Sequence, residues 1–286
     1  MMRSFSFLPT LFCFVLASCT IASGDEANPT SWDDLTFTHS DAFGGQTAKF
    51  HVDGHKAFLV KPPKERSDGS RPWIWYAPTL TGKDGTRNLP GARHAKVIRP
   101  ALDAGCFFAG VDVGESYGSP AGRKVFTAFH RLLVDKLGLD SKAMLFPVSR
   151  GGLMHFNWAA EHPEAVRCIG AIYPVCNLTS YPRLERAAKT YGMTKEELER
   201  DLANHNPIDR LAPLAEKKVP LFHLHGDADK VVPLADNSGL LASRYEELGG
   251  PIRLIVVPGK GHEVVPELWQ DPRLAEFFCE CLEGKR

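Results

Sequence analysis

Residues 143–153 read AMLFPVSRGGL, and this stretch decides the fold. The short apolar run over 143–148 predicts a strand that is buried on both faces. Ser149 follows at a sharp turn, and Gly151 and Gly152 come directly after it, at the start of a predicted helix over 151–161. Glycines at that point let the helix pack close against the strand, which a turn that exposes a nucleophilic serine requires.

The same alternation of strand and helix continues on both sides of this stretch. Further strands are predicted over 73–77, 106–113, 167–173, 220–225 and 252–257, and helices over 121–137, 237–248 and 272–282. Such apolar strands favour an α/β fold with a mostly parallel sheet and helices on both faces. An antiparallel N-terminal hairpin over 47–60, with Asp53 and Gly54 at its turn, is predicted at the edge of the sheet.

One interval is longer than a single crossover helix requires. Residues 174–218 separate two predicted strands and hold helical runs over 183–190 and 195–203, the second beginning with a capping box of Thr194 and Glu197. An insertion there lies beyond the carboxyl ends of the strands, where α/β sheets bind ligands. We therefore expect a helical lid over about 174–218.

Two more of the predicted strands end in polar residues. Residues 225–233 read HGDADKVVP, and residues 258–262 read PGKGH. Because the carboxyl ends of parallel strands lie at one edge of a sheet, Ser149, an aspartate and His262 are expected to meet there. Serine, acid and histidine also follow one another in the order that a Ser-His-Asp hydrolase on such a sheet needs.

With these motifs the chain resembles the α/β-hydrolase superfamily, and within it the prolyl-oligopeptidase and dienelactone-hydrolase-like branch, over about residues 73–282. The family pattern His-Gly-x-x-Asp-x-x-Val-Pro implies Asp229 rather than Asp227 as the acid, and Gly-x-Gly-His implies His262 as the base. Ser149 is then the nucleophile. The sequence departs from the family two residues before the serine. The family has a glycine there and this chain has Pro147, so we expect a crowded turn.

The resemblance also implies an oxyanion hole made by main-chain N–H groups. One belongs to Arg150, directly after the nucleophile. The other comes from the loop after strand 73–77, where Pro78 has no N–H to give, so Thr79 is the preferred donor and Leu80 the second choice. The alternative is that Pro78 and Thr79 only form a turn.

Three residues are candidates for substrate binding. Glu115 and Tyr117 follow strand 106–113 and are expected near the same sheet end as Ser149. Glu115 either pairs with Arg150 or is exposed to solvent together with it. Asn177 opens the insertion and either orients substrate or bonds its own backbone.

Composition excludes several classes of function. The chain has 286 residues, of which 34 are basic and 34 are acidic, so no basic excess exists to bind nucleic acid. Its eleven histidines show no metal-ligand spacing. We therefore expect no metal, no other cofactor and no nucleic-acid partner.

The N-terminal residues are typical of an export signal. Arg3 precedes an apolar run over 5–16, and Leu16-Ala17-Ser18-Cys19 resembles the bacterial lipobox. We expect a signal over 1–18, a tether over 19–34 and a hydrolase domain over 35–286. The protein would then be a periplasmic or cell-surface lipoprotein that meets the membrane only through Cys19. The alternative is ordinary secretion.

These observations predict a serine hydrolase that cleaves a carboxylic ester by acyl transfer, with a small-molecule or carbohydrate ester as substrate. Two alternatives stay open. The first is a prolyl-oligopeptidase-like peptidase, which is less favoured because 286 residues leave no room for the propeller of such peptidases. The second is a non-catalytic, lipid-anchored binding protein with a relic site.

Overall fold

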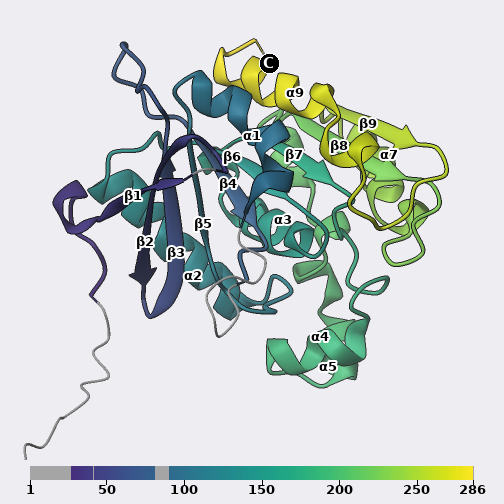
Figure 1. Cartoon of the computed structure of the whole chain (residues 1–286). Helices are drawn as coiled ribbons and strands as arrows, with labels where there is room; N and C mark the ends of the chain where they lie inside the picture. The colour runs from purple at the N-terminus through teal and green to yellow at the C-terminus, as the bar shows by residue number, and fades with distance from the viewer. Residues whose placement is uncertain (1–26, 41, 81–89, 286) are drawn as a thin grey trace, which may run out of the picture.

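The computed structural model of the chain describes residues 27–40, 42–80 and 90–285, so the predicted signal peptide and Cys19 lie outside the described residues. Nine strands form one sheet in the order β1-β2-β3-β5-β4-β6-β7-β8-β9 (Figure 1). Their bounds are β1 Phe37–Ser40, β2 Gly45–Val52, β3 His55–Lys61, β4 Trp73–Ala77, β5 Phe107–Val111, β6 Ala143–Pro147, β7 Val166–Ile172, β8 Leu221–Gly226 and β9 Ile252–Val257.

Strands β4 to β9 run parallel to their neighbours, whereas β1, β2 and β3 pair antiparallel and β3 joins β5 antiparallel. The predicted hairpin is confirmed as β2 and β3. Asp53 and Gly54 both have positive φ angles, 49° and 76°, which suits a two-residue turn. Strand β1, which was not predicted, extends the hairpin by a third strand.

Helices cover both faces of the sheet, so the predicted fold class is confirmed (Figure 1). Their bounds are α1 Ala92–Asp103, α2 Pro120–Arg131, α3 Gly151–Glu161, α4 Leu184–Tyr191, α5 Lys195–Arg200, α6 Ala212–Glu216, α7 Ser238–Glu247, α8 Pro266–Trp269 and α9 Pro272–Leu282. A π-helical turn, Leu132–Lys136, continues α2.

Alternate residues of β4 show how the two layers of the core form. Trp73 and Trp75 pack into the cluster that contains side chains of α2, α3 and α7. Ile74 and Tyr76 pack into the opposite cluster, with side chains of α1, α8 and α9. Because successive side chains of a strand point to opposite faces, this short apolar strand supplies both layers at once.

The insertion between β7 and β8 contains α4, α5 and α6, and Figure 1 shows α4 and α5 standing apart from the helices on the sheet. The predicted capping box is present, since Glu197 N–H donates to Thr194 Oγ1 at 3.1 Å and Thr194 N–H donates to Glu197 Oε2 at 2.7 Å. Apolar residues of α4 and α5 share a buried cluster, here called the insertion cluster, with Tyr117 and Val232. The insertion is therefore anchored on the loops that follow β5 and β8.

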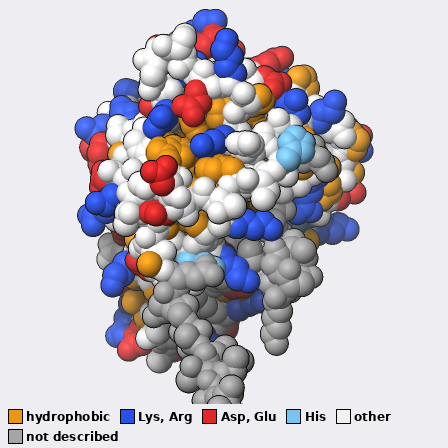
Figure 2. All heavy atoms as spheres, turned by 60° about the vertical axis from the view of Figure 1, so that its left-hand side comes forward, with side chains coloured by type: hydrophobic (Ala, Val, Ile, Leu, Met, Phe, Trp, Pro, Cys, Tyr) orange, Lys and Arg blue, Asp and Glu red, His pale blue; other side chains and the backbone are white. Residues whose placement is uncertain are grey.

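Part of the predicted tether packs against the domain. The indole N–H of Trp32 donates to the carbonyl of Leu137 at 2.9 Å, and the Asn28 amide donates to Asp53 at 2.8 Å. The packed structure thus begins before residue 35. Among the described residues, no helix combines the length and the hydropathy that a membrane span needs. On the face in Figure 2, basic and acidic side chains are interspersed, in keeping with the balanced charge.

Candidate active site

Ser149 lies on a tight turn between β6 and α3, with φ of 52°. A positive φ in a residue other than glycine costs on the order of 1–3 kcal/mol and persists only where the surroundings hold it. Hydrogen bonds hold this turn from both sides: Val148 N–H donates to Ala77 O at 2.8 Å, and Ser149 N–H donates to Ile172 O at 3.1 Å. The serine is therefore fixed between the ends of β4 and β7.

The two glycines after the serine allow the close approach that the sequence predicts. A Cβ atom on Gly151 would lie 2.0 Å from the carbonyl oxygen of Ala77, and one on Gly152 would lie 2.3 Å from that of Val175. Both distances are far below van der Waals contact with rigid backbone. Helix α3 can therefore start against the end of β4 and the segment after β7 only with glycine at these positions.

Pro147 is buried at the last position of β6, opposite Ala77 of β4. Proline cannot donate to a neighbouring strand, and the pairing of β6 with β7 is interrupted between Leu145 and the bridge of Val148 to Ile172. The ladder resumes at that bridge, directly before the serine. The turn at Ser149 therefore forms in spite of the proline.

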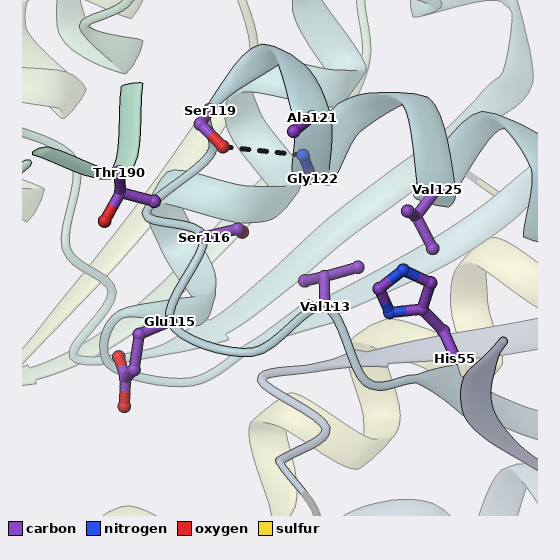
Figure 3. Close-up of a pocket in the computed structure, with 9 residues that line it drawn as sticks. All are labelled: His55, Val113, Glu115, Ser116, Ser119, Ala121, Gly122, Val125 and Thr190. Atoms are coloured by element: carbon purple, nitrogen blue, oxygen red, sulfur yellow. Dashed lines mark hydrogen bonds between the residues drawn. The ribbon is translucent and has the colours of Figure 1, made fainter. Parts of the chain in front are cut away.

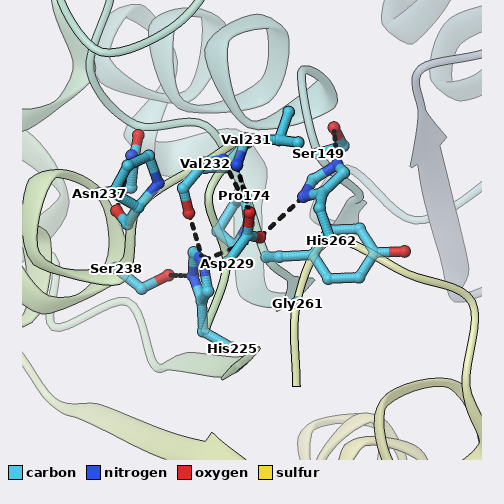
Figure 4. Close-up of polar contacts among 12 residues, drawn as sticks. Ser149, Pro174, His225, Asp229, Val231, Val232, Asn237, Ser238, Gly261 and His262 are labelled. Carbon is cyan, nitrogen blue, oxygen red and sulfur yellow. Dashed lines mark hydrogen bonds and ion pairs between the residues drawn. The ribbon is translucent and has the colours of Figure 1, made fainter. Parts of the chain in front are cut away.

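Ser149, His262 and Asp229 lie in one line of hydrogen bonds (Figure 4). Ser149 Oγ is 2.8 Å from His262 Nε2, and His262 Nδ1 is 2.8 Å from Asp229 Oδ2. A carboxylate can only accept, so Nδ1 carries the proton, and the Nε2 of a neutral ring is then free to accept from the serine hydroxyl. The arrangement has the geometry of a nucleophile, a base and an orienting acid.

The Asp229 carboxylate is fully buried and held at both oxygens. Oδ1 accepts from the main-chain N–H groups of Val231, at 2.9 Å, and Val232, at 2.8 Å. Burial raises the pKa of Asp229, but the interactions with His225, His262 and Val232 N–H outweigh it and hold this pKa below the usual range. Asp229 is therefore ionised where it faces the imidazole.

Asp227, the other carboxylate of the motif, has a different place. It is exposed, and its Oδ1 accepts from Gly259 N–H at 2.6 Å, in the loop after β9. It therefore braces the turn that leads to His262 and does not contact the imidazole. Of the two aspartates, Asp229 is the one that lies beside the His262 ring.

Two aromatic residues at the site were not singled out from the sequence. The Tyr173 ring lies 4.3 Å from the His262 ring, centroid to centroid, and the Trp269 indole N–H donates to the Tyr173 hydroxyl at 2.7 Å. Burial raises the pKa of Tyr173, so its hydroxyl stays protonated. The only sequence signal for Tyr173 is its position at the end of a buried strand, and Trp269 gives none.

The two predicted oxyanion donors, Arg150 and Thr79, lie on the loops that follow β6 and β4. The approach of Gly151 to Ala77 brings the residue after the nucleophile to the end of β4, which Thr79 follows closely. Within the described residues, neither the Arg150 nor the Thr79 main-chain N–H has a hydrogen-bond acceptor. The Thr79 hydroxyl donates to Tyr76 O at 3.1 Å, which fixes the loop.

Glu115 pairs with Arg150, as one of the two predicted arrangements requires. Arg150 Nε lies 3.2 Å from Glu115 Oε1, with exposed side-chain fractions of 23% and 43%. Beside the pair is a pocket of about 310 Å³ (Figure 3), lined by His55, Val113, Glu115, Ser116, Ser119, Ala121, Gly122, Val125 and Thr190. Glu115 thus lines this pocket and also pairs with the residue next to the nucleophile.

Tyr117 contacts the insertion, and Asn177 belongs to it. Tyr117 is 2% exposed, and its carbonyl accepts from the hydroxyl of Tyr191 on α4 at 2.9 Å. The Asn177 side-chain oxygen accepts from the N–H and hydroxyl of Thr179, at 3.1 and 2.8 Å. Asn177 therefore bonds its own loop, which is the alternative to substrate contact that the sequence left open. Among the described residues, no group of histidines, cysteines and carboxylates could hold a metal ion.

Comparisons with known proteins place this geometry in context. Residues 126–285 match the prolyl oligopeptidase family. No curated protein matches the chain.

Several solved structures are similar in fold. The dipeptidyl peptidase 4 of Porphyromonas gingivalis is 16% identical with a TM-score of 0.63, over 86% of this chain and 35% of its own. An S-formylglutathione hydrolase from Agrobacterium tumefaciens is 16% identical with a TM-score of 0.62, over 87% and 98%. Est1E from Butyrivibrio proteoclasticus is 16% identical with a TM-score of 0.59, over 87% and 99%. This chain thus spans 35% of the peptidase and nearly all of the other two, and the shared fold is the α/β-hydrolase fold.

Proposed function

The chain belongs to the prolyl oligopeptidase family of serine hydrolases, and from this premise we propose that it cleaves carboxylic esters by acyl transfer through Ser149, His262 and Asp229. The observation that carries the proposal is the unbroken line of two 2.8 Å hydrogen bonds from Ser149 Oγ through His262 to Asp229. Each residue sits at the carboxyl end of a different strand, so the sheet fixes their relative positions.

In this mechanism the Ser149 oxygen attacks the ester carbonyl while His262 Nε2 takes the hydroxyl proton. The imidazolium then gives the proton to the leaving alkoxide, and a serine ester of the acyl group remains. Water attacks that ester with His262 again as the base, which releases the acid and restores Ser149. Asp229 keeps the imidazole in the productive tautomer and stabilises its positive charge.

The negative charge that develops on the carbonyl oxygen needs donors that are already in place. The main-chain N–H groups of Arg150 and Thr79 fit this role because both lack an acceptor in the described part of the chain. Loss of one such donor costs about 3 kcal/mol in related chemistry. The hydrogen bond from the Thr79 hydroxyl to Tyr76 O would hold this donor in place.

An ester substrate is supported by two of the structural matches. The S-formylglutathione hydrolase and Est1E are each similar in fold to this chain over nearly their whole length. A peptidase is the second candidate, favoured by the family match itself. Small-molecule and carbohydrate esters are the proposed substrates, with Glu115 near the nucleophile as a substrate contact.

The experiment compares the wild-type domain with Ser149→Ala on p-nitrophenyl esters of increasing chain length and on aminoacyl anilides. Ser243→Ala, on the exposed side of α7, is the matched serine control. We expect ester turnover that Ser149→Ala abolishes and Ser243→Ala retains, with a fluorophosphonate adduct on Ser149. Faster cleavage of the anilides would establish the peptidase, and neither turnover nor adduct would leave the binding-protein alternative.

We also propose that the protein is exported, because residues 1–19 carry a basic start, an apolar run and a lipobox-like end. These residues lie outside the described part of the chain, so the proposal depends on the sequence pattern alone.

A further inference from the structure

A row of polar side chains lies behind Asp229, on the side away from His262. His223 and His225 stand two residues apart on β8, so both point to the same face of the sheet. Ser238, the first residue of α7, faces them. All three residues are 0% exposed. Two imidazoles and a hydroxyl thus occupy a position that apolar side chains could fill at a lower desolvation cost.

Hydrogen bonds join these residues to the acid loop, residues 229–232 (Figure 4). Ser238 Oγ lies 2.8 Å from His225 Nδ1 and 3.0 Å from His223 Nδ1. On the other side of its ring, His225 Nε2 lies 2.8 Å from the Val232 carbonyl oxygen and 3.5 Å from Asp229 Oδ2. The row therefore ends at the same carboxylate oxygen that accepts from His262.

The partners of His225 decide where its proton lies. A carbonyl can only accept, so His225 Nε2 carries a proton and donates to Val232. In the neutral ring Nδ1 is then bare and accepts from the Ser238 hydroxyl. That hydroxyl has no second proton, so it accepts in turn from His223 Nδ1–H. With a neutral His225, the Val232 carbonyl thus sets the direction of both hydrogen bonds of Ser238.

His223 closes the row as a neutral ring. Burial lowers the pKa of His223 to about 3. Its Nε2 atom has no hydrogen-bond partner within the described residues, which agrees with a bare nitrogen. The Phe156 ring packs edge-on against it, with centroids 5.7 Å apart. His223 therefore serves Ser238 as a donor only.

We infer that His225 is a positioning residue for Asp229, and that Ser238 and His223 hold His225 in the tautomer this requires. The inference rests on the proposed function of Asp229. Asp229 Oδ1 is fixed by two main-chain N–H groups, so the position of Oδ2 depends on how the acid loop is tied to β8. The His225 to Val232 bond makes that tie, and the Nε2 proton also faces Oδ2. With the other tautomer, a bare Nε2 would face two acceptors and repel the loop.

Two pairs of variants test this role. Ser238→Ala removes the hydroxyl that sets the tautomer, and Ser243→Ala removes an exposed hydroxyl from the same helix as a control. His225→Gln carries an amide N–H to about the position of Nε2, whereas His225→Asn carries one only to that of Nδ1. The measurements are kcat and KM on a p-nitrophenyl ester, the far-downfield proton resonance of the His262 to Asp229 hydrogen bond, and thermal unfolding.

We expect Ser238→Ala and His225→Asn to lower kcat about tenfold with KM unchanged, because the acid acts in the transition state. His225→Gln should retain more activity than His225→Asn. The downfield resonance should shift or broaden in the two impaired variants and stay in place in Ser243→Ala. A purely structural role would lower the unfolding temperature of both His225 variants alike and leave kcat and the resonance unchanged.

Wild-type kcat in Ser238→Ala and His225→Asn, or equal losses in the Gln and Asn variants, would overturn the inference. If Ser238→Ala does not fold, the two His225 variants decide. The downfield resonance is recorded without substrate. A wild-type protein without ester turnover would contradict the proposed function, but the resonance would still report whether the variants move Asp229. Normal turnover with an unmoved resonance in every variant would contradict the positioning role alone.

Discussion

The ring of Tyr173 lies 4.3 Å from the ring of His262, centroid to centroid. Tyr173 directly follows β7, and His262 lies in the loop after β9. Tyr173 has φ of 35°, and its hydroxyl is held by Trp269 of α8. The proposed base is therefore held by an aromatic ring on one side and by Asp229 at Nδ1.

Replacing this ring should affect turnover more than removing its hydroxyl. Tyr173→Ala leaves the imidazole free to turn, and we expect kcat to fall by about ten- to a hundredfold. Tyr173→Phe keeps the ring contact and should retain most of kcat, although the unpartnered Trp269 N–H should lower stability by about 1–3 kcal/mol. Steady-state kinetics and chemical denaturation separate the two effects. Equal kcat losses in both variants would show that the hydroxyl matters more than the ring.

The two aspartates of the HGDAD motif should differ sharply. Asp229→Asn removes the charge at His262 Nδ1 and favours the wrong tautomer, so we expect a loss in kcat of about 10⁴. Asp227→Asn weakens one bond to Gly259 N–H in an exposed loop and should cost less than about tenfold. Kinetics on one ester for both variants gives the comparison. The reverse order would move the acid to Asp227.

Stability should depend on Asp229 in a defined pH range. Its pKa in the folded protein lies below the ordinary value, so its ionised form stabilises the fold above about pH 4. That contribution is lost as pH falls through the folded pKa. The difference in unfolding free energy between wild type and Asp229→Asn should therefore be larger at pH 7 than at pH 3. Urea denaturation at both values measures it, and a constant difference would contradict the charge effect.

Pro147→Gly restores the family pattern before the nucleophile. The new N–H can donate where the pairing of β6 with β7 is now interrupted, and the serine turn loses a bulky neighbour. We expect turnover to be unchanged or higher, and stability to fall by about 0.4–1 kcal/mol because glycine loosens the unfolded chain. A large loss of turnover in a folded variant would show instead that the turn depends on the proline.

Export and anchoring are tested on the full-length chain. In a bacterial host, wild-type protein should fractionate with membranes and incorporate labelled fatty acid, because stable anchoring needs more than one acyl chain. Cys19→Ala should remove both properties and leave esterase activity intact. Soluble wild-type protein that begins beyond Cys19 would establish ordinary secretion.

The sequence predicts those parts of the fold in which a local pattern dominates. Strands over 73–77 and 252–257 and the helix over 151–161 have the predicted bounds, because each is a short run with clear turn residues beside it. Helix α1 was not predicted, since Pro100 interrupts its pattern of buried Val97, Ile98, Ala101 and Leu102. Strand β1 is four residues long and depends on pairing with β2.

The candidate site likewise contains residues that the sequence predicts and residues that it does not. Asp229 and His262 carry motif signals, and the structure brings them to Ser149. Tyr173, Trp269 and Ser238 become part of the site only through contacts between distant segments; Ser238 meets His223 across 15 residues and Trp269 meets Tyr173 across 96. Such pairs leave no periodicity or spacing in the chain, so a single sequence does not reveal them.

Val232 connects three parts of the molecule with three different groups. Its N–H donates to Asp229, its carbonyl accepts from His225, and its side chain is buried in the insertion cluster with residues of α4 and α5. A movement of α4 and α5 that displaces this side chain also displaces the backbone that holds the acid. Val232 is therefore the residue through which a ligand on the insertion would act on Asp229, and any such coupling would be reciprocal.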